Sequence, residues 1–224
     1  MKLIERELGI ELELKENQVS ILIIENISRR LSIINQLYRQ VLGQEGAWIL
    51  VDGEKTYDIR KTCDIILEPF SLELNNRRVR SKLYEEIKEI ANDECYEVGL
   101  RLHSDICNYL EIVLQKIPYP IQYDDSWDVN NILKMYNVEI LDENDNIYEK
   151  ILNYIRMMNQ ICGIQIFIII NAKQFFSETE IVELYKIISY SKINLILIEF
   201  NTSSNRLSQE DIYILDVDDC IITY

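Results

Sequence analysis

The turn after the first strongly apolar run holds the residues that most suggest phosphate chemistry. The run ends at Ile24, and residues 25–32 read ENISRRLS. In α/β proteins, ligands bind beyond the carboxyl ends of such strands. A phosphate loop needs the pattern G-x-x-x-x-G-K-[ST], because glycines let backbone amides approach the phosphates and the lysine neutralises charge. Of these features the segment keeps only hydroxyl groups and positive charge, and Arg29 and Arg30 carry that charge.

ATP hydrolysis is therefore not expected. Two later apolar runs end in Asn171 and Glu199, and neither provides a convincing acid for the magnesium that phosphoryl transfer requires. Arg29 and Arg30 then have two interpretations. They contact phosphate groups of a ligand, or they are ordinary solvated arginines on a helix.

A second basic group, Arg77, Arg78, Arg80 and Lys82, stands at the start of a predicted helix, after Asn75 or Asn76 as its cap. Positive charge in a first helical turn opposes the helix dipole and costs ~0.3–1 kcal/mol per group. One interpretation pairs Lys82 with Glu86 four residues on and leaves the rest solvated. The other is that the cluster and the positive helix end attract phosphate.

Acidic residues are concentrated between residues 124 and 149, where Lys134 is the only base. Calcium prefers several carboxylate and carbonyl oxygens, so this stretch is a calcium candidate, the alternative being a solvated acidic loop. The run DENDN resembles the start of an EF-hand at Asp142, Asn144 and Asn146. Ile147 replaces the glycine of that motif, and Asn153 replaces its bidentate glutamate, so no EF-hand is expected.

Composition narrows the function classes. The formal net charge of −15 argues against a uniformly basic nucleic-acid binder. A single histidine, His103, leaves little basis for Ser-His-Asp chemistry or histidine metal sites. Five cysteines without a C-x-x-C pair favour reduced thiols and a cytoplasmic location. The longest apolar stretch, residues 161–172, is shorter than the ~20 residues of a membrane span, so we expect no membrane partner.

The elements that would position these residues form an α/β pattern. Val19–Ile24 reads as a strand buried on both faces. Ile27, Leu31, Ile34 and Tyr38 follow helical spacing after a cap at Asn26 or Ser28. Asp52-Gly53 between two strand-like runs indicates a hairpin.

The middle of the chain is predicted to be helical, and its end to contain strands and a helix. Residues 77–115 keep helical spacing for about forty positions, which predicts two helices or one protruding arm before Pro118. Shorter helices are expected at 129–136 and 147–160. Residues 164–200 predict a βαβ unit whose helix starts with the capping box Ser177–Glu180, and residues 219–224 predict a last strand. The expected fold is thus a parallel-rich α/β head, residues 1–70 and 155–224, with an inserted, mostly helical leg, residues 71–154.

Residues 146–200, from NIYEKILNYIRMM through IQIFIIINAKQFFSETE to INLILIEF, resemble the C-terminal half of the Csn-two family, the spacer-acquisition proteins of type II-A CRISPR systems. The stretches ILIIENISRRLSIINQLY and DIILEPFSLELNNRRVRSKLYEEI occur in the same order as that family's head strand, its helix and its entry into the leg. The resemblance extends over the whole chain and is loosest over residues 85–120.

The resemblance implies a head related to P-loop ATPases with a degenerate loop, and no catalysis. It further implies a homotetrameric ring that calcium stabilises and that threads double-stranded DNA ends through a basic central hole. Its partners would be the CRISPR integrase complex and the RNA-guided effector nuclease. Such a ring would be acidic outside and basic inside, which reconciles DNA binding with the net charge.

On this basis we expect calcium at Asp124, Asp125, Asp128 and Glu139. Asp124 and Asp125 match acids of the family, whereas Pro120 and Gln122 stand where other members carry acids. Lys134 and Lys150 match basic positions of the family. The expected DNA contacts are Arg29, Arg30, Arg77, Arg78, Arg80, Lys82, Lys134 and Lys150. Two alternatives remain from the residues alone: a diverged nucleotide-binding protein, and an acidic protein-interaction module that does not bind DNA.

Overall fold

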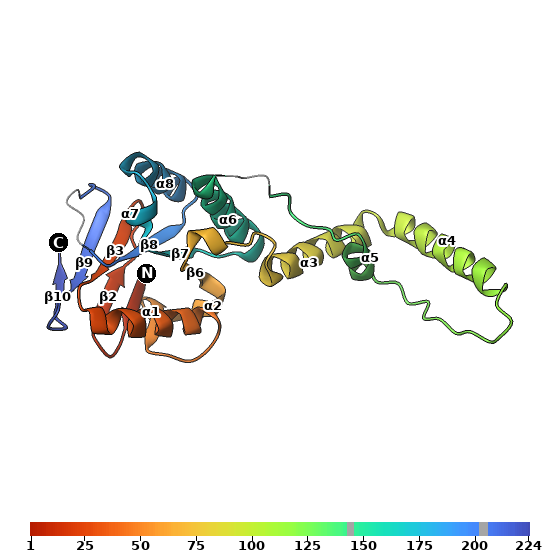
Figure 1. Cartoon of the computed structure of the whole chain (residues 1–224), viewed down its shortest axis with the longest axis horizontal. Coiled ribbons are helices and arrows are strands. Elements are labelled where there is room, and N and C mark those ends of the chain that lie inside the picture. The colour runs from red at the N-terminus through yellow and green to blue at the C-terminus, as the bar shows by residue number, and fades with distance from the viewer. Residues whose placement is uncertain (143–145, 202–205) are drawn as a thin grey trace. The chain divides into compact units, whose positions relative to one another are not determined.

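The structure is a computed structural model that describes residues 1–142, 146–201 and 206–224. The chain divides into two compact units. The head comprises residues 1–73 and 143–224, and the leg comprises residues 74–142. Figure 1 shows the elements of both units, and each unit is described below by itself.

The head is built on a six-stranded sheet with the order β10-β9-β3-β8-β7-β6. Five neighbouring strands run parallel, and β10 is antiparallel to β9, so the sheet is mixed. The strands are β3 (Val19–Ile24), β6 (Cys63–Ile66), β7 (Ile166–Ile170), β8 (Asn194–Glu199), β9 (Glu210–Leu215) and β10 (Ile221–Thr223).

The central strands form where the sequence has unbroken apolar runs. Every residue of β3 and β7 is buried, as expected for strands covered on both faces. β7 and β8 are parallel neighbours with α7 (Ala172–Phe175) and α8 (Glu178–Tyr190) between them, which confirms the predicted βαβ unit. The predicted last strand is confirmed as β10. The capping box is also confirmed, with Ser177 and Glu180 bonded to each other's backbone amides.

A second, antiparallel sheet of four strands has the order β2-β1-β4-β5. Its strands are β1 (Lys2–Glu5), β2 (Ile10–Glu13), β4 (Trp48–Asp52) and β5 (Lys55–Tyr57). The predicted hairpin is confirmed as β4–β5, and Gly53 adopts φ +59° in its turn, a left-handed conformation that glycine tolerates without strain. One core cluster joins this sheet to the six-stranded sheet through α1 (Ile27–Val41).

The helices of the head lie on both sides of the six-stranded sheet. α1 lies on one side, and α6 (Ile147–Cys162) and α8 lie on the other (Figure 1). The buried face of α1 consists of Ile33, Leu37 and Val41, while Ile27 and Leu31 are exposed. The helix is thus where the spacing predicts it, although Ile27 and Leu31 of that apolar pattern do not face the core.

Two shorter elements complete the head, α2 (Ile59–Thr62) and the single 3₁₀ turn Pro69–Ser71. α6 belongs entirely to the head, although the sequence-based division assigns its first residues to the leg. Its apolar side chains from Tyr148 to Met158 are buried along the full length of the helix. That continuous apolar face explains why the division between the units falls before α6.

The leg consists of α3 (Arg77–Asp93), α4 (Tyr96–Leu114) and α5 (Val129–Met135). The long helical pattern is therefore two helices, with the break at Glu94–Cys95. α5 packs beside α3, where the Tyr84 hydroxyl donates to the Leu133 carbonyl over 3.2 Å. The segment after α4 returns along that helix, since the rings of His103 and Trp127 lie 5.3 Å apart.

Among the described residues, no helix combines the length and the apolar character that a bilayer span requires.

Candidate nucleic-acid interface

The start of α1 is occupied by an ion pair within the chain. Asn26 caps the helix, and its side-chain oxygen accepts from the Ser28 amide over 3.1 Å. Arg29 donates to both carboxylate oxygens of Asp219, with the shortest contact at 2.6 Å. The Asn26 amide donates to the same carboxylate over 2.9 Å. The hydrogen bond from Arg29 holds the pKa of Asp219 below its usual range. A carboxylate of the chain itself therefore lies beside the start of α1, bound to Asn26 and Arg29.

Arg30 has a structural role at the carboxyl ends of two strands. Its guanidinium donates to the carbonyl of Ile24 over 2.8 Å and to that of Phe200 over 2.7 Å. It also lies 4.8 Å from the centre of the Phe200 ring, a cation–π contact. These bonds satisfy the last carbonyl of β3 and the carbonyl of the residue after β8. Both predicted phosphate contacts near the loop thus have partners within the head.

The basic cluster of the leg is divided among different partners. Asn76 is the helix cap, accepting from the amides of Arg78 and Val79, whereas the Asn75 side chain bonds the backbone of Ile140. Arg80 pairs with Glu139 at 2.6 Å. Lys82 pairs with Glu85, three residues on.

Three predicted contacts remain accessible. Arg77 is exposed at the first position of α3, and Lys134 is exposed in the last turn of α5. Lys150 is half-buried in the first turn of α6. Arg77 and Lys134 belong to the leg and Lys150 to the head. Arg78 is half-buried and takes part in other interactions of the leg.

The predicted calcium ligands have separate local roles. Asp124 accepts from the Ser126 amide at 2.9 Å, which lowers its pKa. Asp128 caps α5 by accepting from the Asn130 amide, which lowers its pKa, and it pairs with Lys88 at 3.5 Å. Asp125 is exposed, and Glu139 is bound to Arg80.

These residues do not form one cluster. Within residues 1–142, 146–201 and 206–224, no three histidine, cysteine or acidic side chains lie close enough to share a metal ion. The predicted acids Glu143 and Asp145, with Asn144, lie outside the described residues. Carboxylate oxygens are ligands that suit calcium, so the donor type fits, while a site in one chain would need carbonyls or water besides.

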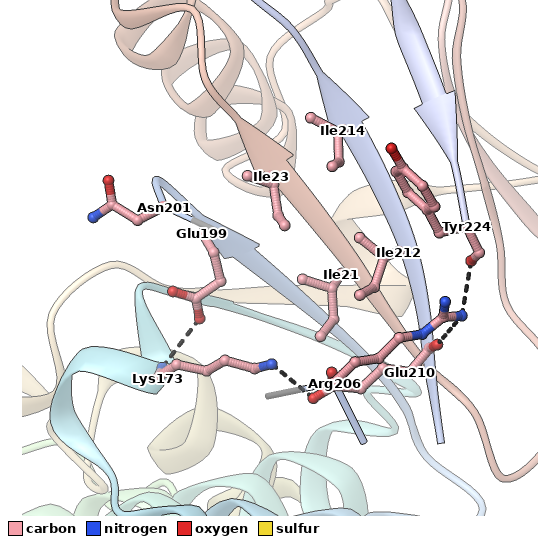
Figure 2. A pocket seen from close by; sticks show the side chains of 10 residues that line it. All are labelled: Ile21, Ile23, Lys173, Glu199, Asn201, Arg206, Glu210, Ile212, Ile214 and Tyr224. Atoms are coloured by element: carbon pink, nitrogen blue, oxygen red, sulfur yellow. Dashed lines mark hydrogen bonds and ion pairs between the residues drawn. The ribbon is translucent and has the colours of Figure 1, made fainter. Parts of the chain in front are cut away.

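A cavity of about 290 Å³ lies on the face of the six-stranded sheet opposite α1 (Figure 2). Its floor is formed by isoleucines of β3 and β9, at positions 21, 23, 212 and 214. Charged residues surround this floor, and Lys173 pairs with Glu210 over 2.8 Å. Glu199 accepts from the Lys173 amide over 3.1 Å, and burial raises its pKa to about 7.

A comparison with models of known protein families identifies a match for most of the chain. Residues 40–219 match the family described as CRISPR-associated protein (Cas_Csn2). The chain belongs to this Cas_Csn2 family. The family resemblance expected from residues 146–200 is thereby confirmed, and a CRISPR-associated role follows from it. No curated protein sequence matches this Cas_Csn2 chain.

Solved structures similar to the Cas_Csn2 chain include two ATP-binding components. One is cbiO1 from Clostridium perfringens, part of the ABC transporter complex cbiONQ, at 15% identity and TM-score 0.49, covering 92% of this chain and 76% of that one. The other is an ATP-binding cassette of an ABC transporter in its ADP conformation, at 11% identity and TM-score 0.48, covering 96% and 82%.

Reasoning from the sequence missed two groups of residues in this Cas_Csn2 chain. Asp219 lies 190 positions from its partner Arg29, and no local pattern joins them. The cavity draws on strands that are distant in sequence, together with Lys173 and Glu210. The alternating isoleucines of β9 could have indicated this strand. Its acidic start, Glu210-Asp211, made the strand pattern hard to recognise.

Proposed function

We propose that this protein is a non-enzymatic, sequence-independent binder of double-stranded DNA ends that acts as a calcium-dependent homotetrameric ring in CRISPR spacer acquisition. The observation that carries the proposal is membership of the Cas_Csn2 family over residues 40–219. The proposed partners are the integrase complex and the RNA-guided effector nuclease. The head is proposed to be a P-loop ATPase relative whose loop is degenerate.

The start of α1 supports the absence of hydrolysis. A hydrolase needs glycine amides and a lysine at the phosphates and a metal-binding acid. Residues 25–32 contain neither glycine nor lysine, and the Asp219 carboxylate lies against Arg29 and Asn26. An incoming phosphate would meet a fixed negative charge there. Arg29 and Arg30 are accordingly weaker candidates for DNA contact than Arg77 and Lys134.

The exposed bases of the leg support an electrostatic contact with the DNA backbone. Arg77 stands beside the amino end of α3, whose first turn contains no acid to neutralise it. Phosphate favours such helix ends because the unpaired amides and the helix dipole both attract negative charge. Since backbone contacts carry no base information, this arrangement fits a binder of any sequence.

The surface of α4 supports assembly. All 19 residues of this helix are described, and none is buried. Val98, Leu102, Ile106, Tyr109 and Val113 are exposed and recur at steps of three or four residues. They therefore form one apolar stripe along the helix, called the α4 stripe below. Monomeric proteins rarely leave such a continuous apolar surface in water, so a copy of the chain is the proposed cover.

The proposed calcium ligands lie in the acidic segment of the leg. Asp124 and Asp125 would supply carboxylate oxygens, and carbonyls or water would complete the six to eight ligands that calcium takes. Asp124 accepts from the Ser126 amide at 2.9 Å and from the Ser126 side chain, and a carboxylate has about four lone-pair positions, so some remain for a cation. When bound, the ion would neutralise charge in an acidic segment and hold it in one conformation.

Charge reversal tests the DNA contact. Arg77→Glu with Lys134→Glu should weaken binding to a linear duplex at least tenfold, because two phosphate contacts are lost and two repulsive charges appear. The log–log salt slope should fall by roughly 0.9 per contact removed. Lys116→Glu, an exposed lysine of the leg outside the predicted set, is the matched control and should have a smaller effect.

A DNA affinity that does not change with salt would contradict the electrostatic contact. Equal losses in binding free energy per reversed charge in the double variant and in Lys116→Glu would also contradict it, because the effect would then follow net charge rather than position. Arg80 is left intact in this experiment, since it holds Glu139 within the leg.

A further inference from the structure

The floor of the head cavity is a flat apolar platform. Ile21 is the direct neighbour of Ile212 across the β3–β9 pair, and Ile23 is the neighbour of Ile214. Residues two apart in a strand point to the same face, roughly 6.6 Å apart, and paired strands lie roughly 4.8 Å apart. The four side chains thus form a small rectangle whose size suits one planar ring system. Figure 2 shows them side by side on the two strands.

The charged residues around the platform have partners within the head. Glu210 is fully buried and saturated, since Oε1 accepts from the Tyr185 hydroxyl at 2.8 Å and pairs with Lys173, and Oε2 accepts from the Leu207 amide at 3.2 Å. Lys173 is likewise committed to Glu210. Arg206 donates to the carbonyls of Glu210 and Tyr224. Lys173 and Glu210 are therefore committed to each other, and the Arg206 guanidinium is held in place by backbone carbonyls.

Glu199 is the polar group best placed to meet a ligand on the platform. It is the neighbour of Ile23 on the next strand and is only 4% exposed. It accepts from the amides of Lys173 and Ala172, and a carboxylate has about four lone-pair positions in total. It thus retains capacity to accept a hydrogen bond at the edge of the platform, opposite the donor Arg206 in Figure 2.

We propose that this cavity binds a planar, uncharged heteroaromatic ring that lies on the four isoleucines and donates an N–H to Glu199. An apolar surface flanked by a few polar groups that fix orientation is the usual composition of a small-molecule site. A volume of about 290 Å³ holds one or two fused rings with a small substituent. The site lies on the sheet face opposite α1, so it is separate from the strand end at Arg29 and does not depend on the function proposed above.

Isoleucine methyl NMR on the full chain tests the proposal, with adenosine as the probe. Saturable shifts should be confined to Ile21, Ile23, Ile212 and Ile214, with a dissociation constant of roughly 0.1–1 mM for a ligand of this size. At pH 8, above the pKa of about 7 at which Glu199 ionises, Glu199→Gln should weaken adenosine about fivefold to tenfold, because a neutral acceptor bonds less strongly than a carboxylate. Asp211→Asn, a carboxylate that alternates with Ile212 and pairs with Lys15, is the control and should change the affinity less than twofold.

A variant that fills the platform and two comparison ligands distinguish the proposed site from other kinds of cavity. Ile214→Trp should place an indole on the platform and abolish the shifts, and a thermal melt establishes that the variant is folded. Toluene and benzylamine are the comparison probes. The proposal is overturned if adenosine produces no saturable shift or if its shifts lie on other isoleucines. It is equally overturned if only toluene binds, which indicates a simple apolar cavity, or only benzylamine, which indicates a cation site.

Discussion

Ion pairing within the chain decides which charged residues are available to a ligand. Arg29 is bound to Asp219, Arg30 to two strand-end carbonyls, and Arg80 to Glu139. Exposed pairs of this kind contribute little to stability, but they fix the direction of the side chain. Arg77 and Lys134 are exposed instead, and so they are the bases on which the DNA-binding proposal mainly rests.

Glu199 should make the stability of the head depend on pH. Burial raises its pKa to about 7 in the folded chain, against about 4.3 in the unfolded chain. The folded state therefore binds the proton more tightly, and stability should fall as the pH rises from about 4.5 to about 7. Glu199→Gln cannot ionise.

Chemical unfolding of both proteins at pH 5 and pH 8 measures this effect. The free energy of unfolding of the variant, relative to the natural chain, should rise by about 1–3 kcal/mol between the two pH values. An equal change with pH in both proteins would show that Glu199 does not titrate in this range.

At the level of helices and strands, local sequence determines most of what forms. β3, β7 and β8 arise from apolar runs that are buried on both faces, and α8 begins at its capping box. β9 was not predicted, because it opens with two acids, one of which, Glu210, is buried with Lys173, the Tyr185 hydroxyl and the Leu207 amide as partners. Ile33 and Leu37 of α1 belong to the core cluster that includes the second sheet, whereas Ile27 and Leu31 of the same apolar pattern are exposed.

The candidate site was less predictable than the fold. Residue types indicated phosphate and calcium chemistry, yet the partners Asp219, Glu139 and Glu85 come from tertiary contacts or from a choice between neighbouring acids. Charged side chains are long and have several acceptors within reach, so spacing alone does not select one. The isoleucine platform required the strand order, which places β9 beside β3.

The capping box of α8 provides a prediction at this scale. Ser177→Ala removes the acceptor for the Glu180 amide and the partner of its carboxylate. The free energy of unfolding of the head should fall by about 1 kcal/mol, the usual loss for such a cap. Ser191→Ala, an exposed serine after the same helix, should change it by less than half as much. Equal effects in the two variants would contradict a capping role for Ser177.

At the scale of the whole molecule, the proposed function requires several copies of the chain to assemble. The α4 stripe exposes five apolar side chains on a helix without buried residues. A charge within the stripe would have to be buried at an interface without a partner, at a cost of several kcal/mol.

Ile106→Glu should therefore shift the protein from oligomer to monomer in sedimentation velocity, with unchanged helix content by circular dichroism. Asn108→Glu adds the same charge on another side of α4 and should leave the oligomer intact. An oligomer that survives Ile106→Glu would show that the α4 stripe is not the interface.

The most direct test of the central claim is size-exclusion chromatography with light scattering, performed with and without calcium and with a linear duplex. With calcium we expect a species of about four times 26.6 kDa, near 106 kDa, that co-elutes with linear duplex of any sequence. Chelation should dissociate it and release the DNA, and a closed circular duplex should not be retained. A chain that elutes as a 26.6 kDa monomer in every condition and leaves linear duplex free would contradict the account.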